Sequence, residues 1–389
     1  MSYLVYPGAT HKRFEHSLGV MELATRIFDV LIRDENRHAA TRDLFPPPTQ
    51  LEYWRRVLRM AALCHDIGHL PFSHAAEGLL PVGWDHERIS VEIVKSNDMQ
   101  RIWDSVIPPL KAEHVAKIAV GQKKMKDVAF SVWENILSEI IVSDYFGADR
   151  MDYLLRDAYH TGVAYGKFDH YRLIDTLRIL PKTSDDSSEP EIGVEEGGLQ
   201  SAEALILARY FMYKQVYFHP VRRIFDVHLQ DFLKAYLPHG QFPVVLSEFL
   251  ALSDAEMLAA MHSCKSGGRE PICELAKRLV DRQHFKREYE VPQADLDRNL
   301  RALELLKASC EAEFGVDNIR SDKYRPKKML PDFPVWGSNG DIVRSGYASD
   351  VFAHIPSFSV NSIFCSRQLR GQVRKWIDAN RDKVLFSRS

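Results

Sequence analysis

Histidine and aspartate stand next to each other in the stretch CHDIGH, residues 64–69, and this pair has the chemistry of a metal ligand set. Adjacent side chains on a helix point about 100° apart, so His65 and Asp66 can bind one ion only if it lies between their directions. Imidazole and carboxylate together suit Mn, Fe, Co, Ni or Zn, and Mg where oxygen ligands and water dominate. Two ligands do not complete a site, so others must come from elsewhere in the chain.

The other ligands that we expect are His16 and a carboxylate from a distant helix. His16 lies in GATHKRFEHSLGV, residues 8–20, where apolar spacing predicts the start of a helix. A second segment, residues 132–160, is predicted to be one long helix. It carries three candidate carboxylates, Asp144, Asp149 and Asp152. A lone His-Asp pair is usually structural, and it becomes a metal site when separate helices bring such groups together.

The elements that must position these residues are mainly helical. Apolar residues at helical spacing predict the helices 14–33, 50–65, 86–96, 111–120, 132–160 and 201–237. The polar, acidic stretch 182–198 predicts a surface excursion, with hairpin strands near 176–181 and 191–195. Residues 240–310 carry further helices, including 294–313. Strands and loops are expected over 320–366, before a last helix at 366–380. We expect a mainly α fold with one unit over 1–237 and a smaller α+β region over 238–389.

The overall composition favours neither a membrane nor a strongly acidic or basic partner. The chain has 389 residues, of which 45% are hydrophobic and 27% charged, with a formal net charge of −2. No apolar run approaches the ~18 residues that cross a bilayer, and the N-terminus lacks a secretory pattern. The chain has five widely spaced cysteines, which indicate neither a disulfide scaffold nor a zinc ribbon and fit a reducing cytoplasm. The short basic clusters at 123–126 and 325–328 permit nucleic-acid binding without indicating it.

Three motifs in order give the chain a family resemblance. HKRFEHSLGV, LCHDIGHLPFSH and DRMDYLLRD strongly resemble those of the HD-domain dNTP triphosphohydrolases, and the resemblance is dense over residues 3–230. It implies an HD-domain helical bundle that hydrolyses deoxynucleoside triphosphates to deoxynucleoside and inorganic triphosphate with one divalent metal ion. It also implies a homo-oligomer. The metal ligands that it implies are His16, His65, Asp66 and Asp149.

The same resemblance implies roles for residues around the metal. A triphosphate carries about four negative charges, so cations must line its pocket. By resemblance the phosphate-binding arginines are Arg13, Arg209 and, where the family often has lysine, Arg150. Tyr153 and Asp157 match positions that meet the sugar, and Tyr217, on the same helix face as Arg209, could stack on the sugar or base. The resemblance puts His69 and His86 beside the scissile phosphate, with His86 as general acid, Glu77 and Glu87 supporting it, and His74 either in contact with substrate or packing.

Several alternatives stay open at the level of sequence. Arg209, Tyr213 and Tyr217 also fit an ordinary amphipathic helix with a surface arginine. Family members carry a segment before residue 3 that takes part in sugar discrimination and nucleotide activation, so a shortened N-terminus is expected here. Other possible functions are an HD phosphohydrolase or nuclease acting on another nucleotide or single-stranded DNA, and a nucleotide-binding regulator with little turnover.

Overall fold

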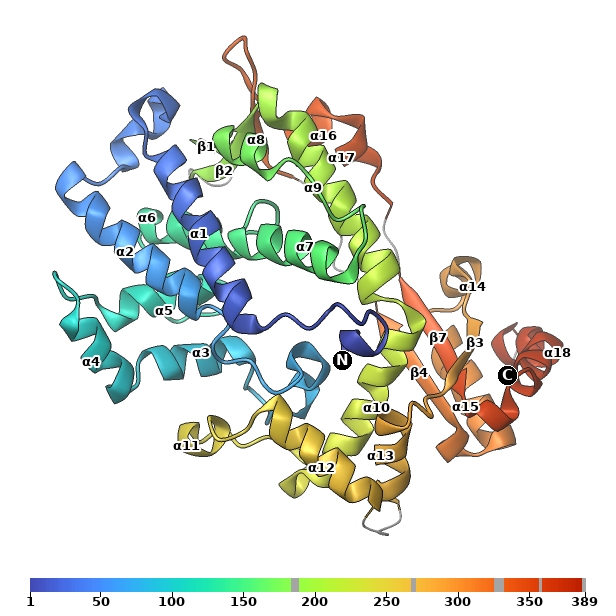
Figure 1. The fold of residues 1–389 in the computed structure, drawn as a ribbon. Coiled ribbons are helices and arrows are strands. Elements are labelled where there is room, and N and C mark those ends of the chain that lie inside the picture. Colours follow the sequence, from blue (N-terminus) through green and yellow to red (C-terminus); the bar gives the residue numbers. More distant parts are fainter. Residues whose placement is uncertain (183–188, 267–270, 325–331, 357–358, 387–389) are drawn as a thin grey trace.

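The fold is mainly α, as the sequence predicts, with two small sheets (Figure 1). The computed structural model describes residues 1–182, 189–266, 271–324, 332–356 and 359–386. The predicted helices at 14–33, 50–65, 86–96 and 111–120 are confirmed with small shifts at their ends. These helices are α1 Arg13–Leu31, α2 Pro48–Cys64, α3 His86–Val94 and α5 Ala112–Val120, and α4 Asn97–Ser105 lies between the last two.

The first helices form a bundle around a large apolar core. Helix α1 packs against α2 and α7, and α2 packs against α5. The buried side chains of α1 recur at Val20, Ala24, Ile27 and Leu31, which is the spacing of one helix face. This face fixes the rotation of α1, so its first turn meets the end of α2 and the start of α7.

The predicted helix at 132–160 is in fact two helices, α6 Val132–Val142 and α7 Ala148–Thr161. The turn between them folds back tightly, because a Cβ on Gly147 would lie 2.5 Å from the carbonyl oxygen of Ile141. Asp144 therefore lies in the turn and not on the helix that carries Asp149 and Asp152. The expectation that all three aspartates share one helix was wrong.

The predicted hairpin is confirmed as β1 Leu177–Leu180 and β2 Glu191–Glu195, which pair antiparallel after the short helix α8 His170–Asp175. Part of the polar excursion, 183–188, lies outside the described residues. Two strands from late in the chain join this hairpin, with β5 Pro334–Trp336 parallel to β2 and β6 Ile342–Arg344 antiparallel to β5. The following short helices are α16 Ser345–Ala348 and α17 Asp350–His354.

The region predicted as one helical stretch over 201–237 is interrupted. Helix α9 Leu199–Met212 runs into a π-helical turn, Tyr213–Tyr217, and α10 Pro220–Tyr236 follows. The next helices are α11 Leu246–Phe249, α12 Asp254–Ser266 and α13 Ile272–Val280, of which α13 packs against both α10 and α12. They enclose a second apolar core with Phe225, Phe232 and Phe242.

The C-terminal part is built on a three-stranded antiparallel sheet in the order β3-β7-β4. Its strands are β3 Lys286–Glu290, β4 Ile319–Tyr324 and β7 Val360–Cys365, and its helices are α14 Gln293–Arg298, α15 Ala302–Phe314 and α18 Gln372–Phe386. The predicted helix at 294–313 is two helices, and β3 lies within a stretch that we expected to be helical. The polar sequence of β3, KREYE, shows no apolar alternation that could have revealed it.

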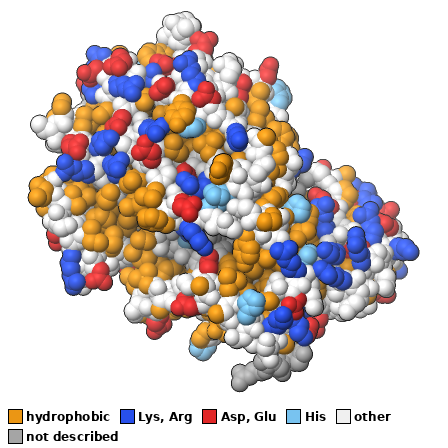
Figure 2. Space-filling model, in the orientation of Figure 1, with side chains coloured by type: hydrophobic (Ala, Val, Ile, Leu, Met, Phe, Trp, Pro, Cys, Tyr) orange, Lys and Arg blue, Asp and Glu red, His pale blue; other side chains and the backbone are white. Residues whose placement is uncertain are grey.

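Charged and histidine side chains gather near the middle of the face drawn in Figure 2. Lys and Arg side chains collect separately over the C-terminal sheet on the same face. Among the described helices, none is both long enough and apolar enough to cross a membrane.

Candidate active site

The four side chains expected to bind metal converge from three helices. His16 lies on the first turn of α1, His65 and Asp66 directly follow α2, and Asp149 lies on the first turn of α7. The Nε2 atoms of His16 and His65 are 3.1 and 3.6 Å from Oδ1 of Asp149, and His65 Nε2 is 3.4 Å from Oδ1 of Asp66. Ligand atoms about 2.1 Å from one ion lie about 3.0–3.4 Å apart, so these separations suit a common cation.

The ring orientation of both histidines supports a divalent cation at this centre. His65 donates from Nδ1 to the carbonyl oxygen of Ala62 at 2.8 Å, and His16 donates from Nδ1 to Asp152 Oδ2 at 2.7 Å. Such hydrogen bonds fix each ring and direct its Nε2 atom to the centre. His65 Nε2 is fully buried and has no hydrogen-bond partner among the described residues. Since a buried nitrogen without a partner is costly, the donor set fits a metal ion.

The electrostatics of the centre favour positive charge. Burial alone would lower the pKa of His16, but its hydrogen bonds to Asp149 and Asp152 outweigh burial and raise that pKa to about 10. Burial would raise the pKa of Asp149, but the hydrogen bond from His16 and the nearby imidazole of His65 hold that pKa well below its usual range. Asp66 is held ionised in the same way, mainly by His65, His69 and Arg13.

A glycine sets the close approach of the two helices that carry His16 and Asp149. A Cβ on Gly19 would lie 1.8 Å from Oδ1 of Asp152, so α1 and α7 can meet here only because residue 19 has no side chain. Asp152 also accepts hydrogen bonds from Arg156 at 2.8 and 2.9 Å. The sequence offered Asp152 only as an alternative ligand, and in the structure it positions His16.

A second cluster of histidines lies beside the first. The rings of His69 and His86 stack with their centroids 3.9 Å apart and an interplanar angle of 14°. The ring of His74 meets both edge-on, at 4.7 and 5.3 Å. His69 Nε2 lies 3.4 Å from Asp66 Oδ1, which connects the two clusters. The structure thus brings together the residues that the family resemblance put near one phosphate.

The environments of the two stacked histidines shift their pKa values in opposite directions. Burial lowers the pKa of His69 to about 3, so this ring is neutral at physiological pH. Burial also acts on His86, but Glu77, 2.5 Å from its Nδ1, and Glu87, at 3.2 Å, outweigh it and raise its pKa. Glu77 also lies 3.2 Å from His74 Nδ1. Of the two stacked rings, only His86 is therefore placed to hold a proton and act as an acid.

Arg13 lies at the edge of the metal centre. Its guanidinium donates to Asp66 and to Oγ of Ser73, and the Nε–Oγ distance is 2.9 Å. Ser73 and its neighbour Phe72 both have left-handed backbone conformations, with φ of 58° and 61°. Asp254 from α12 accepts a hydrogen bond from the Phe72 amide at 2.8 Å and helps to hold this loop. Ser73 lies within the motif LCHDIGHLPFSH, but our sequence analysis did not single it out.

The residues expected at the sugar form a stripe along α7. Asp149, Tyr153 and Asp157 recur every four residues, so they share one face of the helix. Tyr217 donates from Oη to Asp157 Oδ2 at 2.6 Å, and its ring lies 6.0 Å from that of Tyr153. The Oη atoms of Tyr153 and Tyr213 are 3.5 Å apart.

Arg150 and Arg209 converge on the turn between α6 and α7. Arg150 donates to the carbonyl oxygen of Ser143 at 2.8 Å and to the Asp144 carboxylate at 2.7 Å, and Arg209 donates to the Asp144 carbonyl at 2.9 Å. Arg209 Nε is buried without a partner among the described residues. Asp144 also pairs with Lys123, so it serves as a partner of cations and is not in the group of possible metal ligands.

Two protein-family models match the chain, and one of them covers the candidate active site. The model of the HD domain matches residues 13–154, which contain all four expected ligands, and that of the HD associated region matches residues 168–317. The chain belongs to the HD-domain phosphohydrolase superfamily. The HD protein is therefore an enzyme of the hydrolase class whose fold has a place for a divalent metal.

Relatives of this HD protein include uncharacterized and characterized proteins. It is 29% identical over 363 residues to the uncharacterized protein YwfO of Bacillus subtilis, covering 86% of this chain and 75% of that one. It is 30% identical over 257 residues to the human deoxynucleoside triphosphate triphosphohydrolase SAMHD1, covering 60% of this chain but only 38% of the human protein. The chain thus spans well under half of the human relative.

Solved structures share the fold. A hypothetical protein from Aquifex aeolicus has 32% identity and a TM-score of 0.75, with 96% of this chain and 89% of that chain covered. A phosphohydrolase from Bacteroides thetaiotaomicron has 23% identity and a TM-score of 0.67, with 94% and 90% covered, which is a likeness of fold.

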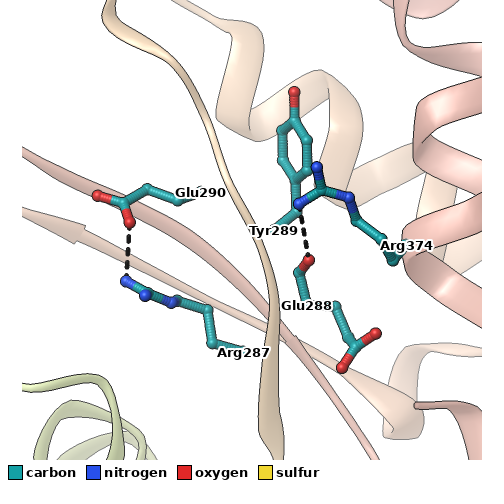
Figure 3. Close-up of a pocket in the computed structure, with 5 residues that line it drawn as sticks. All are labelled: Arg287, Glu288, Tyr289, Glu290 and Arg374. Atoms are coloured by element: carbon teal, nitrogen blue, oxygen red, sulfur yellow. Dashed lines mark hydrogen bonds and ion pairs between the residues drawn. The ribbon is translucent and has the colours of Figure 1, made fainter. Parts of the chain in front are cut away.

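A surface pocket on the C-terminal sheet is not part of this site. It has a volume of about 340 Å³ and is lined by Arg287, Glu288, Tyr289, Glu290 and Arg374 (Figure 3). Its polar groups are occupied with each other, since Arg287 pairs with Glu290 at 2.8 Å and Arg374 lies over the ring of Tyr289. None of these residues belongs to the histidine clusters.

Proposed function

We propose that this HD protein hydrolyses deoxynucleoside triphosphates to deoxynucleoside and inorganic triphosphate. The observation that supports this best is the order of groups along α7. Asp149 at the metal centre, Tyr153 and Asp157 share one face, and eight residues of helix span about 12 Å. That length suits a phosphate at the metal centre, a sugar against tyrosine and a hydroxyl on the last carboxylate. SAMHD1, whose name states this activity, is a relative over 60% of the chain.

In this proposal His16, His65, Asp66 and Asp149 hold one divalent cation. When bound, the cation supplies a Lewis acid for phosphoryl oxygens and lowers the pKa of water. Arg13, Arg150 and Arg209 bind the phosphate chain as cationic hydrogen-bond donors. Arg13 donates to Asp66 and Ser73 in the structure, so it must exchange these contacts for substrate oxygens.

The bond that breaks in the proposed reaction joins the α-phosphorus to the 5′-oxygen of the sugar. A water oxygen attacks the α-phosphorus from the opposite side, and the whole triphosphate leaves the nucleoside. His86, held protonated by Glu77 and Glu87, gives its proton to the departing 5′-oxygen. The water loses a proton to solvent or to the triphosphate product, so the charges balance.

His69 has a different role in this scheme. Because its pKa is lowered to about 3, it holds a proton poorly and is a weak base. Its Nε2 atom, 3.4 Å from Asp66, can instead accept a hydrogen bond and orient the attacking water. His74, which is exposed, shares Glu77 with His86 and lies where it can donate to a phosphate oxygen.

Product analysis tests this function. The protein, loaded in turn with Mn, Co, Ni, Zn and Mg, is incubated with each dNTP and each ribonucleotide, and products are identified by mass. We expect free triphosphate and deoxynucleoside, and we expect Asp66→Ala to abolish both. Release of phosphate or pyrophosphate, shortening of DNA, or tight nucleotide binding without products would each contradict the proposal.

A further inference from the structure

His11 reaches the far end of the α7 stripe from a segment that precedes α1. Its Nε2 atom lies 2.9 Å from Oδ1 of Asp157, and both side chains are largely buried, with 19% and 23% exposed. The segment is held closely to α7, because a Cβ on Gly8 would lie 2.5 Å from the carbonyl oxygen of His160. The ring of His160 stacks on that of His11 at 4.4 Å.

The carboxylate of Asp157 is consequently held from two sides by different elements. Tyr217 donates to Oδ2 at 2.6 Å from the end of the π-helical turn, while His11 faces Oδ1. Each carboxylate oxygen can accept about two hydrogen bonds, so a carboxylate held by one contact on each oxygen can still accept a hydrogen bond from a ligand. The two contacts together fix the plane of the carboxylate, and this plane decides where a ligand hydroxyl must lie.

The two ring nitrogens of His11 have different surroundings. Nε2 faces Oδ1 of Asp157 at 2.9 Å. In the structure His11 Nδ1 is buried and has no hydrogen-bond partner among the described residues. The contacts that hold the ring are therefore that of Nε2 with Asp157 and the stacking on His160.

We infer that His11 is a positioning residue for sugar recognition, which aims the Asp157 carboxylate at the 3′-hydroxyl of a bound nucleotide. This inference rests on the proposed function, since it takes the substrate to be a nucleoside triphosphate with its sugar at Asp157. His11 acts through Asp157 and need not touch the substrate. Replacement of His11 should therefore weaken recognition of the 3′-hydroxyl and leave the rate of cleavage at the α-phosphorus unchanged.

The test compares two substrates that differ only in this hydroxyl. A deoxynucleoside triphosphate has the 3′-hydroxyl, and the matching 2′,3′-dideoxynucleoside triphosphate lacks it. His11→Phe keeps an aromatic ring against His160 and removes the Nε2 atom that faces Asp157. We expect it to raise KM about tenfold for the deoxynucleotide, the effect of one lost hydrogen bond, with little change in kcat and little effect on the dideoxynucleotide. His11→Gln, whose amide can donate to Asp157, should have a KM for the deoxynucleotide close to that of wild type.

The outcomes separate this inference from the proposed function. Equal losses on both substrates would show that His11 only anchors its segment, and unchanged KM on both would show that it has no role; either result overturns the inference. Wild-type protein that releases no triphosphate would overturn the proposed function alone. In that case, His11 can still be tested by measuring the dissociation constants of the two nucleotides in the presence of Ca²⁺. If the ratio of these two constants is the same in wild type and His11→Phe, the inference about His11 is overturned. Thermal unfolding of each variant confirms that it is folded.

Discussion

Replacement of Asp152 by asparagine tests whether metal binding depends on a residue that does not touch the metal. Asp152 accepts the Nδ1 proton of His16 at 2.7 Å, and the two side chains are only 8% and 10% exposed. Asparagine can still accept this proton through Oδ1, but its charge is lost. In the wild-type protein the guanidinium of Arg156 donates to both carboxylate oxygens of Asp152. In the variant it faces the amide nitrogen of asparagine instead of one of these oxygens.

The expected magnitude follows from two opposing effects. Loss of an outer carboxylate partner of a ligating histidine typically weakens metal binding by about 10–100-fold. The pKa of His16 is raised to about 10, partly by Asp152, so a proton competes with the metal. The variant lowers that pKa and reduces the competition. We therefore expect the lower end of the range, about tenfold or ~1.4 kcal/mol.

The assay is a titration of Mn²⁺ or Ni²⁺ by calorimetry at a fixed pH, with a chelator as competitor for tight binding. Asp157→Asn is the matched control, since it makes the same change on the same helix but contacts His11 and Tyr217 instead of His16. Asp149→Asn removes a ligand and gives the upper limit of the loss. If Asp152→Asn binds within twofold of wild type while Asp149→Asn fails, the orientation of His16 does not depend on Asp152 and our reasoning is wrong.

Two further changes act on acid–base chemistry and on packing. Glu77→Gln removes the carboxylate closest to His86 and lowers the pKa of His86, so the alkaline limb of the pH–rate profile for triphosphate release should move to lower pH. Glu87 lies farther from His86 Nδ1, at 3.2 Å rather than 2.5 Å, so Glu87→Gln should move this limb less. A limb that does not move in Glu77→Gln would exclude His86 as the acid. Gly19→Ala should lower the unfolding temperature by several degrees, because its Cβ overlaps Asp152, whereas Gly346→Ala meets no atom within 4 Å and serves as control. Equal melting of both glycine variants would contradict the close packing of α1 on α7.

Much of the site follows from the sequence because its residues lie in short motifs on strongly periodic helices. His16, His65 and Asp66 stand at helix ends that apolar spacing places well, whereas the start of α7, which carries Asp149, was missed, and only the motif DRMDYLLRD singled out that residue. The residues that orient these side chains are harder to predict from the sequence. Ser73 and His11 lie in loops, where long-range contacts decide the conformation and local pattern carries little information.

The errors in the predicted fold have the same origin. The break at 143–147 and the break after Arg298 interrupt segments whose composition suits continuous helix, so tertiary packing overrides local preference. Strand β3 is polar on both faces except at Tyr289, and its pairing with β7 defines it. Domain limits at residue 237 stay a prediction.

The pairing of β5 with β2 has a consequence for where the chain can be divided. The match to the HD associated region ends at residue 317, yet Phe333, Val335 and Phe352 lie beyond it and are buried in the same core as α1 and α7. A protein shortened to the matched segments would uncover the edge of β2 and leave cavities where two phenylalanine rings had been, a loss of about 3–5 kcal/mol for each. The segment from Phe333 to Phe352 thus completes the core of the half that carries the metal centre, although it comes from the opposite end of the sequence.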